Sequence, residues 1–131
     1  MNPNNDWKFE KDGLLYSFRS AGVLIYGGKL LIRCGIPNTE CALPGGAVRY
    51  GELSAQTVVR EFGEETGAQV SAERLIWVAE SFWRPRGQNR HSVCHYYLMK
   101  LMDPIRIPLT GTFGSLDNAG SRRIFSWIPE A

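Results

Sequence analysis

The chain is poor in cysteine, carries little net charge and contains no long apolar run. No apolar stretch approaches the roughly 18 residues that a membrane-spanning helix needs. The N-terminal segment MNPNNDWKFEKDG is polar and has no hydrophobic core of the kind found in signal peptides. The formal net charge of +2 is small and argues against nucleic acid as the main partner. We therefore expect a cytoplasmic protein without membrane association.

The three cysteines, Cys34, Cys41 and Cys94, are odd in number and form no CxxC pair. This pattern is typical of reduced thiols in a cytosolic protein, which fits the expected location. A chain of 131 residues without internal repeats has the size of one domain. We expect a single domain over residues 14–131, preceded by a flexible N-terminal arm over residues 1–13, where apolar residues are few.

The pattern of apolar residues and turns predicts an α+β fold. Gly27 and Gly28 separate two β-rich runs and are suited to a tight hairpin turn, in which both residues need positive φ. Pro104 and Pro108 restrict the run 105–109 to a weak edge strand. The remaining expected strands are 16–26, 29–34, 41–43, 74–83, 92–102 and 124–128, and one helix is expected over 53–66.

Acidic side chains gather on one side of the expected helix, after the glycine-rich turn at residues 43–46. At about 100° per residue, Glu61, Glu64 and Glu65 share one face. Glu61 and Glu65 are like charges at i, i+4 and destabilise the helix unless a cation lies between them. Carboxylate oxygens suit a hard divalent ion, Mg²⁺ first and Mn²⁺ second. The alternative interpretation is a solvated acidic face.

Residues 46–68, GAVRYGELSAQTVVREFGEETGA, resemble the Nudix box, G-x5-E-x7-R-E-U-x-E-E-x-G-U, where U is a bulky apolar residue. The last position departs from the pattern, because Ala68 is small. The similarity extends over about residues 17–129. It implies a Nudix-type α/β/α sandwich around a mixed β-sheet, with the usual C-terminal helix absent or truncated. The matching positions are Gly46, Glu52, Arg60, Glu61, Phe62, Glu64, Glu65 and Gly67.

The resemblance implies an enzyme that cleaves the diphosphate linkage of a nucleoside diphosphate joined to another moiety, with Mg²⁺. It makes Glu61 and Glu65 metal ligands, completed by the carbonyl oxygen of Gly45 or Gly46. Glu64 is either a further ligand or the base that takes a proton from water, and both roles stay open. Arg60 would hold these glutamates by charged hydrogen bonds, with Glu52 as a supporting partner.

Outside the box, basic residues are candidates for contacting substrate phosphates. Arg33 ends a strand that leads to the glycine-rich turn, and Arg84, Arg86 and Arg90 lie in an expected loop over 84–91. The alternative for each is a solvated position. A distant catalytic acid could come from Glu80, Asp103 or Asp117, between which the sequence does not choose. The large aromatic residues Trp7, Trp77, Phe82 and Trp83 are more typical of a core than of a base-stacking site.

The functional prediction has two alternatives. The first is a nucleotide-binding or regulatory module on the same fold without catalysis, which loss of box glutamates would mark, and none is lost. The second is a different chemistry such as prenyl-diphosphate isomerisation, which needs a further catalytic cysteine and glutamate. The expected partner is a small-molecule nucleoside diphosphate derivative of unspecified identity. Homodimer formation is left open.

Overall fold

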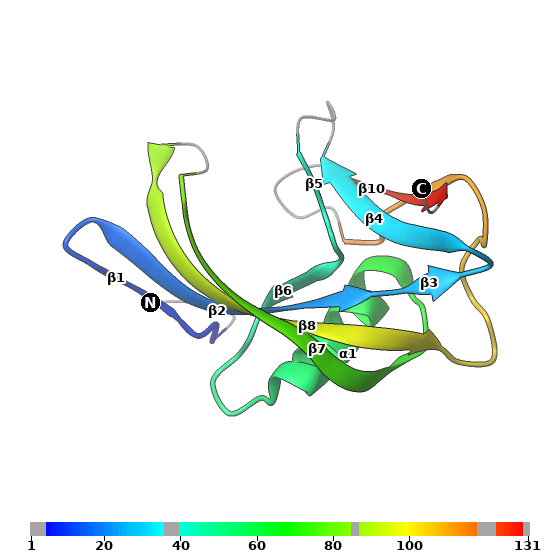
Figure 1. Cartoon of the computed structure of the whole chain (residues 1–131), viewed down its shortest axis with the longest axis horizontal. Coiled ribbons are helices and arrows are strands. Elements are labelled where there is room, and N and C mark those ends of the chain that lie inside the picture. Colours follow the sequence, from blue (N-terminus) through cyan, green and yellow to red (C-terminus); the bar gives the residue numbers. More distant parts are fainter. Residues whose placement is uncertain (1–4, 36–39, 85–86, 118–122, 130–131) are drawn as a thin grey trace.

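The computed structural model describes residues 5–35, 40–84, 87–117 and 123–129, and within them it contains ten strands and one helix. The expected α+β class is confirmed (Figure 1). The elements are β1 (Lys8–Lys11), β2 (Leu14–Val23), β3 (Ile25–Tyr26), β4 (Lys29–Gly35), β5 (Cys41–Ala42), β6 (Gly45–Ala47), α1 (Ser54–Thr66), β7 (Val70–Trp83), β8 (Asn89–Leu101), β9 (Thr112–Gly114) and β10 (Arg123–Pro129).

The strands form two sheets (Figure 1). The long sheet has the order β1-β2-β8-β7, with β6 paired to β2, and the second sheet has the order β3-β4-β10-β9, with β5 paired to β4. Strands β2 and β8 run parallel while the other pairs are antiparallel, so the long sheet is mixed, as expected. Gly27 and Gly28, both with positive φ, make the predicted turn between β3 and β4.

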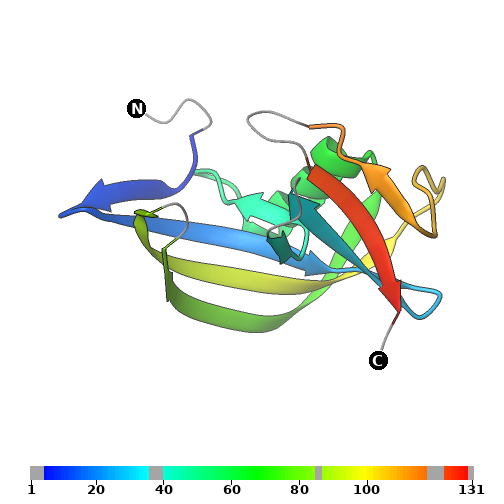
Figure 2. The same ribbon diagram turned by 90° about the horizontal axis from the view of Figure 1, so that it is seen from above.

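Helix α1 packs on one face of the long sheet, and the core lies where it meets both sheets (Figure 2). Val58 and Phe62 are fully buried on the predicted apolar stripe. Gly22 on β2 permits this approach, because a Cβ there would lie 2.6 Å from the Phe62 ring. Gly67 ends the helix in a left-handed conformation, as predicted. Core residues from the sheets include Leu24, Leu31, Val70, Met99, Phe125 and Trp127.

Among the described residues no second helix covers the opposite face of the long sheet, which agrees with the expected lack of the C-terminal helix. No helix in the described part of the chain is long and apolar enough to cross a membrane.

Two assignments of local structure are corrected. Residues 8–11 of the segment expected to be a flexible arm form β1, paired with β2, because Phe9 stacks on Tyr16 with ring centroids 5.1 Å apart. Residues 1–4 lie outside the described residues, and the domain division at residue 13 stays a prediction. The run 105–109 is not a strand, because Pro104 and Pro108 lack backbone donors. The edge strand is β9 instead.

The expectation of three reduced cysteines is also wrong. Cys34 on β4 and Cys41 on β5 are register partners and form a disulfide bond, while Cys94 is a free thiol. The spacing alone did not reveal the pair, because the contact depends on how β5 folds back on β4. The cysteine argument for a reducing compartment therefore loses its basis.

Candidate metal and phosphate site

The glycine-rich turn brings backbone directly against the acidic face of α1. Gly46 lies on β6, opposite Ser20 of β2. A Cβ at Gly46 would lie 2.5 Å from the carboxylate of Glu61, so this close approach requires glycine. Gly45 is packed as tightly, because a Cβ there would collide with the backbone of Ser20 and Ala21.

Arg60 forms charged hydrogen bonds with glutamates of the box, as predicted from the sequence. Its Nε donates to Oε2 of Glu52 at 2.8 Å and its Nη2 donates to Oε1 of Glu52 at 3.0 Å. Nη1 donates to Oε1 of Glu61 at 2.9 Å and to Oε1 of Glu64 at 3.2 Å. The carbonyl oxygen of Ala47 accepts a further bond. Arg60 thus holds Glu52, Glu61 and Glu64 in position relative to β6.

The third glutamate, Glu65, pairs with a different arginine. Its side chain is 1% exposed, and its Oε1 accepts a 2.7 Å hydrogen bond from Nη1 of Arg33. The same Nη1 donates to the carbonyl oxygen of Gly45 at 3.0 Å. Arg123 on β10 lies 3.8 Å from Glu65. Arg33 is therefore no solvated edge residue, because its guanidinium reaches into the predicted metal site.

The donor atoms fit a divalent metal ion. Oε2 of Glu65 is buried and has no hydrogen-bond partner among the described residues, which leaves one carboxylate oxygen for a cation. The neighbouring carboxylate of Glu61 and the carbonyl of Gly45 supply further hard oxygen donors. Among the described residues no three acidic, histidine or cysteine side chains stand together as a ready metal cluster. Arg60 binds the carboxylates of Glu61 and Glu64, while Arg33 binds that of Glu65. We expect a bound metal ion to bring these carboxylates closer together.

The pKa values of the glutamates reflect these different surroundings. The pKa of the Glu61 carboxyl is raised to about 7, chiefly by burial and also by the neighbouring charge of Glu65, while Arg60 opposes the shift. Hydrogen bonding from Arg60 lowers the pKa of Glu52 to about 2. Glu52 is therefore charged throughout the neutral pH range and pairs with Arg60, while Glu61 changes its charge near neutrality.

The structure adds one residue that the sequence analysis missed. Arg19 lies on β2 in the alternate positions to Phe18 and Ser20, which face α1. Burial lowers the pKa of its guanidinium, and the charges of Glu61, Arg33 and Arg90 act on it. The alternation within β2 was the available signal. The sequence analysis expected a strand over residues 16–26 and did not single out Arg19 within it.

The three arginines expected in the loop 84–91 differ in their surroundings. Strand β8 begins at Asn89, so Arg90 and His91 lie in a strand and the predicted loop is shorter than 84–91. Arg90 lies over the Trp83 ring, 5.3 Å from its centroid, and its buried Nε has no hydrogen-bond partner within residues 5–35, 40–84, 87–117 and 123–129. Arg84 donates to the carbonyl of Gly87 within its own turn. Arg86 lies outside the described residues.

Of the three candidate distant acids, Asp117 lies in a segment that contacts the end of α1. Ser115 Oγ bonds to the carbonyl oxygens of Glu65 and Asp117, which sets the segment carrying Asp117 against the end of α1. Glu80 lies on β7 beside His91 on the α1-facing side of the sheet, and Asp103 lies in an exposed turn. The four large aromatics expected in the core are instead 39% to 71% exposed: Trp7, Trp77, Phe82 and Trp83.

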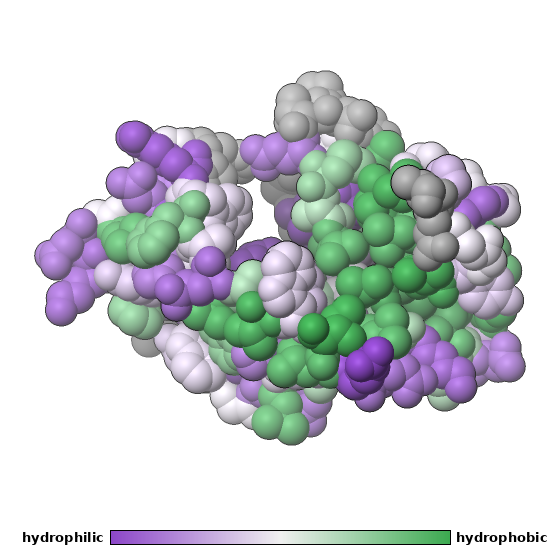
Figure 3. Space-filling view, viewed as in Figure 1, coloured by the Kyte–Doolittle hydropathy of each residue, from purple (hydrophilic) through white to green (hydrophobic). Residues whose placement is uncertain are grey.

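Figure 3 shows a hollow between the outer ends of β7 and β8 and the second sheet, with hydrophilic residues inside it. Both Arg33, on β4, and Arg19, on β2, belong to the strands that border this region. The arrangement places cationic groups beside buried carboxylates, which is suited to holding an anionic ligand through a bridging metal ion.

A family model and solved structures both relate this chain to Nudix hydrolases. The NUDIX domain family model matches residues 17–127. The fold is similar to a MutT NUDIX hydrolase from Burkholderia pseudomallei, with a TM-score of 0.64 and 21% identity over 87% of this chain and 83% of that one. It is also similar to an ADP-ribose pyrophosphatase from Streptococcus suis, with a TM-score of 0.55 and 21% identity over 76% of this chain and 70% of that one.

Among curated proteins, a putative mutator protein MutT4 from Mycobacterium tuberculosis is 33% identical over 61 residues. That match covers 47% of this chain and 25% of the other protein, so the chain spans about a quarter of the length of this relative.

Proposed function

The chain belongs to the Nudix family, whose domain model matches most of its length, and on this premise we propose that it is a metal-dependent hydrolase of diphosphate linkages. The substrate class is a nucleoside diphosphate linked to another moiety. The observation that carries the proposal is the buried Oε2 of Glu65, which has no hydrogen-bond partner in the part of the chain that the structure describes and lies beside further oxygen donors. The ADP-ribose pyrophosphatase of similar fold supports the substrate class by its name.

Each residue of the site has a distinct proposed role. Glu61, Glu65 and the carbonyl of Gly45 or Gly46 would hold Mg²⁺, or Mn²⁺ in its place. Bound there, the ion supplies neutralisation of phosphate charge and activation of water. Glu64, whose side chain is 40% exposed, would act as a further ligand or accept a proton from water. Arg60 and Glu52 keep the carboxylates in position.

The arginines would bind the phosphate groups. Arg33, Arg19 and Arg90 lie on three different strands and influence one another electrostatically, so an anion among them relieves their repulsion. Arg84 and Arg86 stay proposed contacts at the end of the substrate farther from the metal. The catalytic set is thus Glu61, Glu64 and Glu65 with Arg60.

A second candidate is a nucleotide-binding module without catalysis. The specific observation in its favour is that Arg33 neutralises Glu65, so that the site is balanced without a metal ion. In this case a nucleotide would bind to the arginines and no bond would be broken. A cytoplasmic location and a homodimer also stay predictions.

The deciding experiment is a panel of nucleoside triphosphates, ADP-ribose, dinucleoside polyphosphates and coenzyme A, assayed with Mg²⁺ and with excess EDTA. Product identification shows which phosphorus is attacked. The Glu65→Gln variant is expected to lose at least about a hundredfold in kcat, as lost electrostatic preorganisation typically does. Turnover that survives EDTA, or a fully active variant, would refute the proposal. Binding without turnover would favour the non-catalytic module.

A further inference from the structure

Strand β5 connects two parts of the proposed metal site that belong to different sheets. Strand β4 of the second sheet carries Arg33, and β6 of the long sheet carries Gly45, whose carbonyl oxygen accepts a 3.0 Å hydrogen bond from Nη1 of Arg33. Figure 1 shows β5 leading from the edge of β4 to β6. The segment 41–45 is therefore held to β4 at both ends. The connection at its start is the Cys34–Cys41 disulfide, and the connection at its end is the bond from Arg33.

The noncovalent contacts between β5 and β4 are few among the described residues. Strand β5 has two residues, both exposed, and pairs with β4 at Arg33 and Cys34. One further backbone bond runs from the N–H of Gly35 to the carbonyl oxygen of Glu40 at 3.1 Å. So short a pairing at the edge of a sheet is weak by itself. Strand β4 also pairs with β10, and β6 pairs with β2, without any part of the disulfide. Reduction should therefore release β5 and leave the fold intact.

The disulfide is open to attack at one of its two sulfur atoms. Cys41 is exposed, whereas Cys34 is only 5% exposed. A thiolate of a dithiol reductant would therefore attack Sγ of Cys41. The S–S bond breaks, and Cys34 leaves as a thiolate that takes up a proton. The second thiol of the reductant then displaces Cys41, which is also protonated. Two electrons and two protons thus pass to the protein, and the dithiol is oxidised to a disulfide.

We propose that the disulfide between Cys34 and Cys41 is a reversible redox switch of the metal site. The inference rests on the proposed metal site. In the oxidised form the disulfide keeps Arg33 against Gly45, because two connections that hold one segment reinforce each other. Once β5 is released, Arg33 separates more easily from the carbonyl oxygen of Gly45 and from Glu65. A metal ion then competes with a less firmly held guanidinium, so the reduced form is the one that binds metal.

The main alternative is a disulfide that only stabilises the fold. Both interpretations predict a lower melting temperature after reduction, so stability alone does not separate them. They differ at the metal site. A purely structural disulfide would leave Mg²⁺ affinity unchanged, or lower it after reduction as the site loses order. The redox switch requires the affinity to rise.

The test is a calorimetric titration of the full chain with Mg²⁺, with and without excess dithiothreitol. A count of free thiols establishes the redox state, because Cys94 is free in both forms and reduction adds the other two cysteines. The reduced form should bind Mg²⁺ at least about fivefold more tightly, the low end of typical coupling between sites. By the same linkage, saturating Mg²⁺ should make the disulfide easier to reduce by the same factor. The double variant Cys34→Ser, Cys41→Ser controls for the reductant, since it should bind Mg²⁺ equally tightly with and without dithiothreitol.

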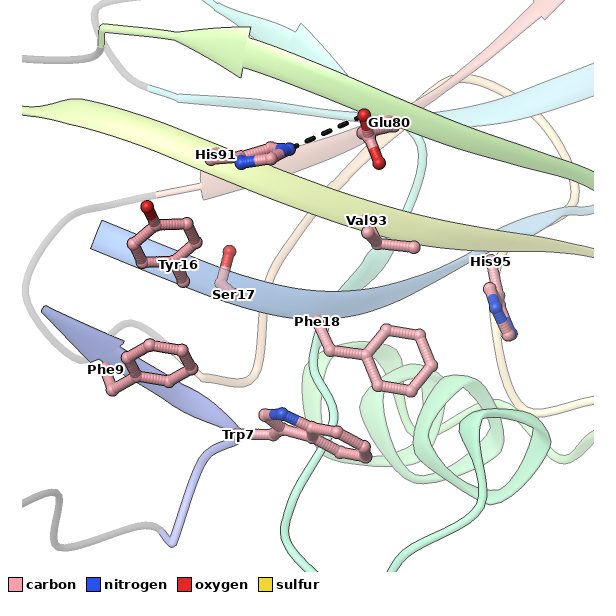
Figure 4. A pocket seen from close by; sticks show the side chains of 9 residues that line it. All are labelled: Trp7, Phe9, Tyr16, Ser17, Phe18, Glu80, His91, Val93 and His95. Atoms are coloured by element: carbon pink, nitrogen blue, oxygen red, sulfur yellow. Dashed lines mark ion pairs between the residues drawn. The ribbon is translucent and has the colours of Figure 1, made fainter. Parts of the chain in front are cut away.

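The variant Arg33→Met tests how the coupling is transmitted. Reduction should leave its Mg²⁺ affinity unchanged, because the competing guanidinium is gone. The NMR signal of the Trp7 indole N–H shows whether reduction acts locally. Trp7 packs against Phe18 with ring centroids 5.0 Å apart, in a group of labelled residues that contains no cysteine (Figure 4). Its signal should keep its folded position when the disulfide is reduced.

Equal Mg²⁺ affinity in the two forms, or weaker binding after reduction, overturns the switch and leaves the hydrolase proposal intact. A disulfide that resists excess dithiothreitol in the folded protein also overturns it. So does an effect of reduction that persists in Arg33→Met, or a Trp7 signal that moves to its unfolded position. Absence of Mg²⁺ binding in both forms overturns the metal site itself and with it the proposed function.

Discussion

Nη1 of Arg33 lies 2.7 Å from Oε1 of Glu65 and 3.0 Å from the carbonyl oxygen of Gly45. These two oxygens are among the groups that we propose as metal ligands. Arg33 therefore supplies the positive charge that a buried carboxylate requires when no metal ion is bound. A metal ion that enters the site has to compete with this guanidinium, and the released arginine would then be available to a substrate phosphate.

Replacing Arg33 by methionine should raise Mg²⁺ affinity several-fold. The variant loses the bond that stabilises the metal-free site, whereas the metal-bound site loses less. Isothermal titration calorimetry at pH 8 measures the affinity directly. The metal-free variant should also melt at a lower temperature, because Glu65 is left without its partner. Arg106→Met, at an exposed position, is the control. Unchanged metal affinity in Arg33→Met would show that arginine and metal do not compete.

The carboxylate of Glu52 should contribute to stability in a pH-dependent way. Hydrogen bonding from Arg60 lowers its pKa from 4.5 to about 2 in the folded protein. A lowered pKa means that this stabilisation is present above about pH 4.5 and is lost as the pH falls towards 2. Glu52→Gln should therefore reduce the free energy of unfolding at pH 7 by about 1.5–3 kcal/mol, the range for hydrogen bonds to charged groups.

Urea denaturation of wild type and Glu52→Gln at pH 7 and at pH 3 measures this difference. The gap between the two proteins should narrow at the lower pH. The control is Glu73→Gln, at an exposed position on β7. A gap that is the same at both pH values would mean that the side chain acts through packing rather than through its charge.

Gly46→Ala should separate site geometry from folding. The added Cβ would lie 2.5 Å from the Glu61 carboxylate, so this side chain has to move. We expect turnover to fall at least about tenfold, because a small misplacement of a catalytic group has large effects. Far-UV circular dichroism should be unchanged. Gly35→Ala is the matched control, since a Cβ at Gly35 meets no atom of the described residues within 4 Å. Full activity in Gly46→Ala would show that the position of Glu61 is not needed for the reaction.

The box and its helix could be predicted from the sequence because their spacing is local. Residues 46–67 carry a periodic pattern, and α1, Gly67 and the Arg60 contacts follow from it. The pairing of Arg33 with Glu65 and of Cys34 with Cys41 could not be predicted, because both contacts join different elements of structure. The exposure of Trp77 was missed for the same reason, since burial of a strand face depends on what packs against it.

Arg19 and Arg90 provide the last prediction, which concerns how substrate binds. Arg90 lies at the start of β8, and its buried Nε has no hydrogen-bond partner among the residues that the structure describes. Arg19 lies on the neighbouring strand β2, where the charges of Arg33 and Arg90 oppose its own. Mutual repulsion of this kind is relieved by a bound anion.

Arg19→Ala and Arg90→Ala should each raise KM about tenfold for the best substrate in the panel, the scale of one lost charged hydrogen bond. Their kcat should change less, because the carboxylate site is untouched. The effect should shrink at high salt if part of the attraction is long-range. Arg74→Ala, exposed on β7, serves as the control. If KM is unchanged in both variants, the substrate anion binds elsewhere. Arg19 and Arg90 then act only through the electrostatic potential at Glu61.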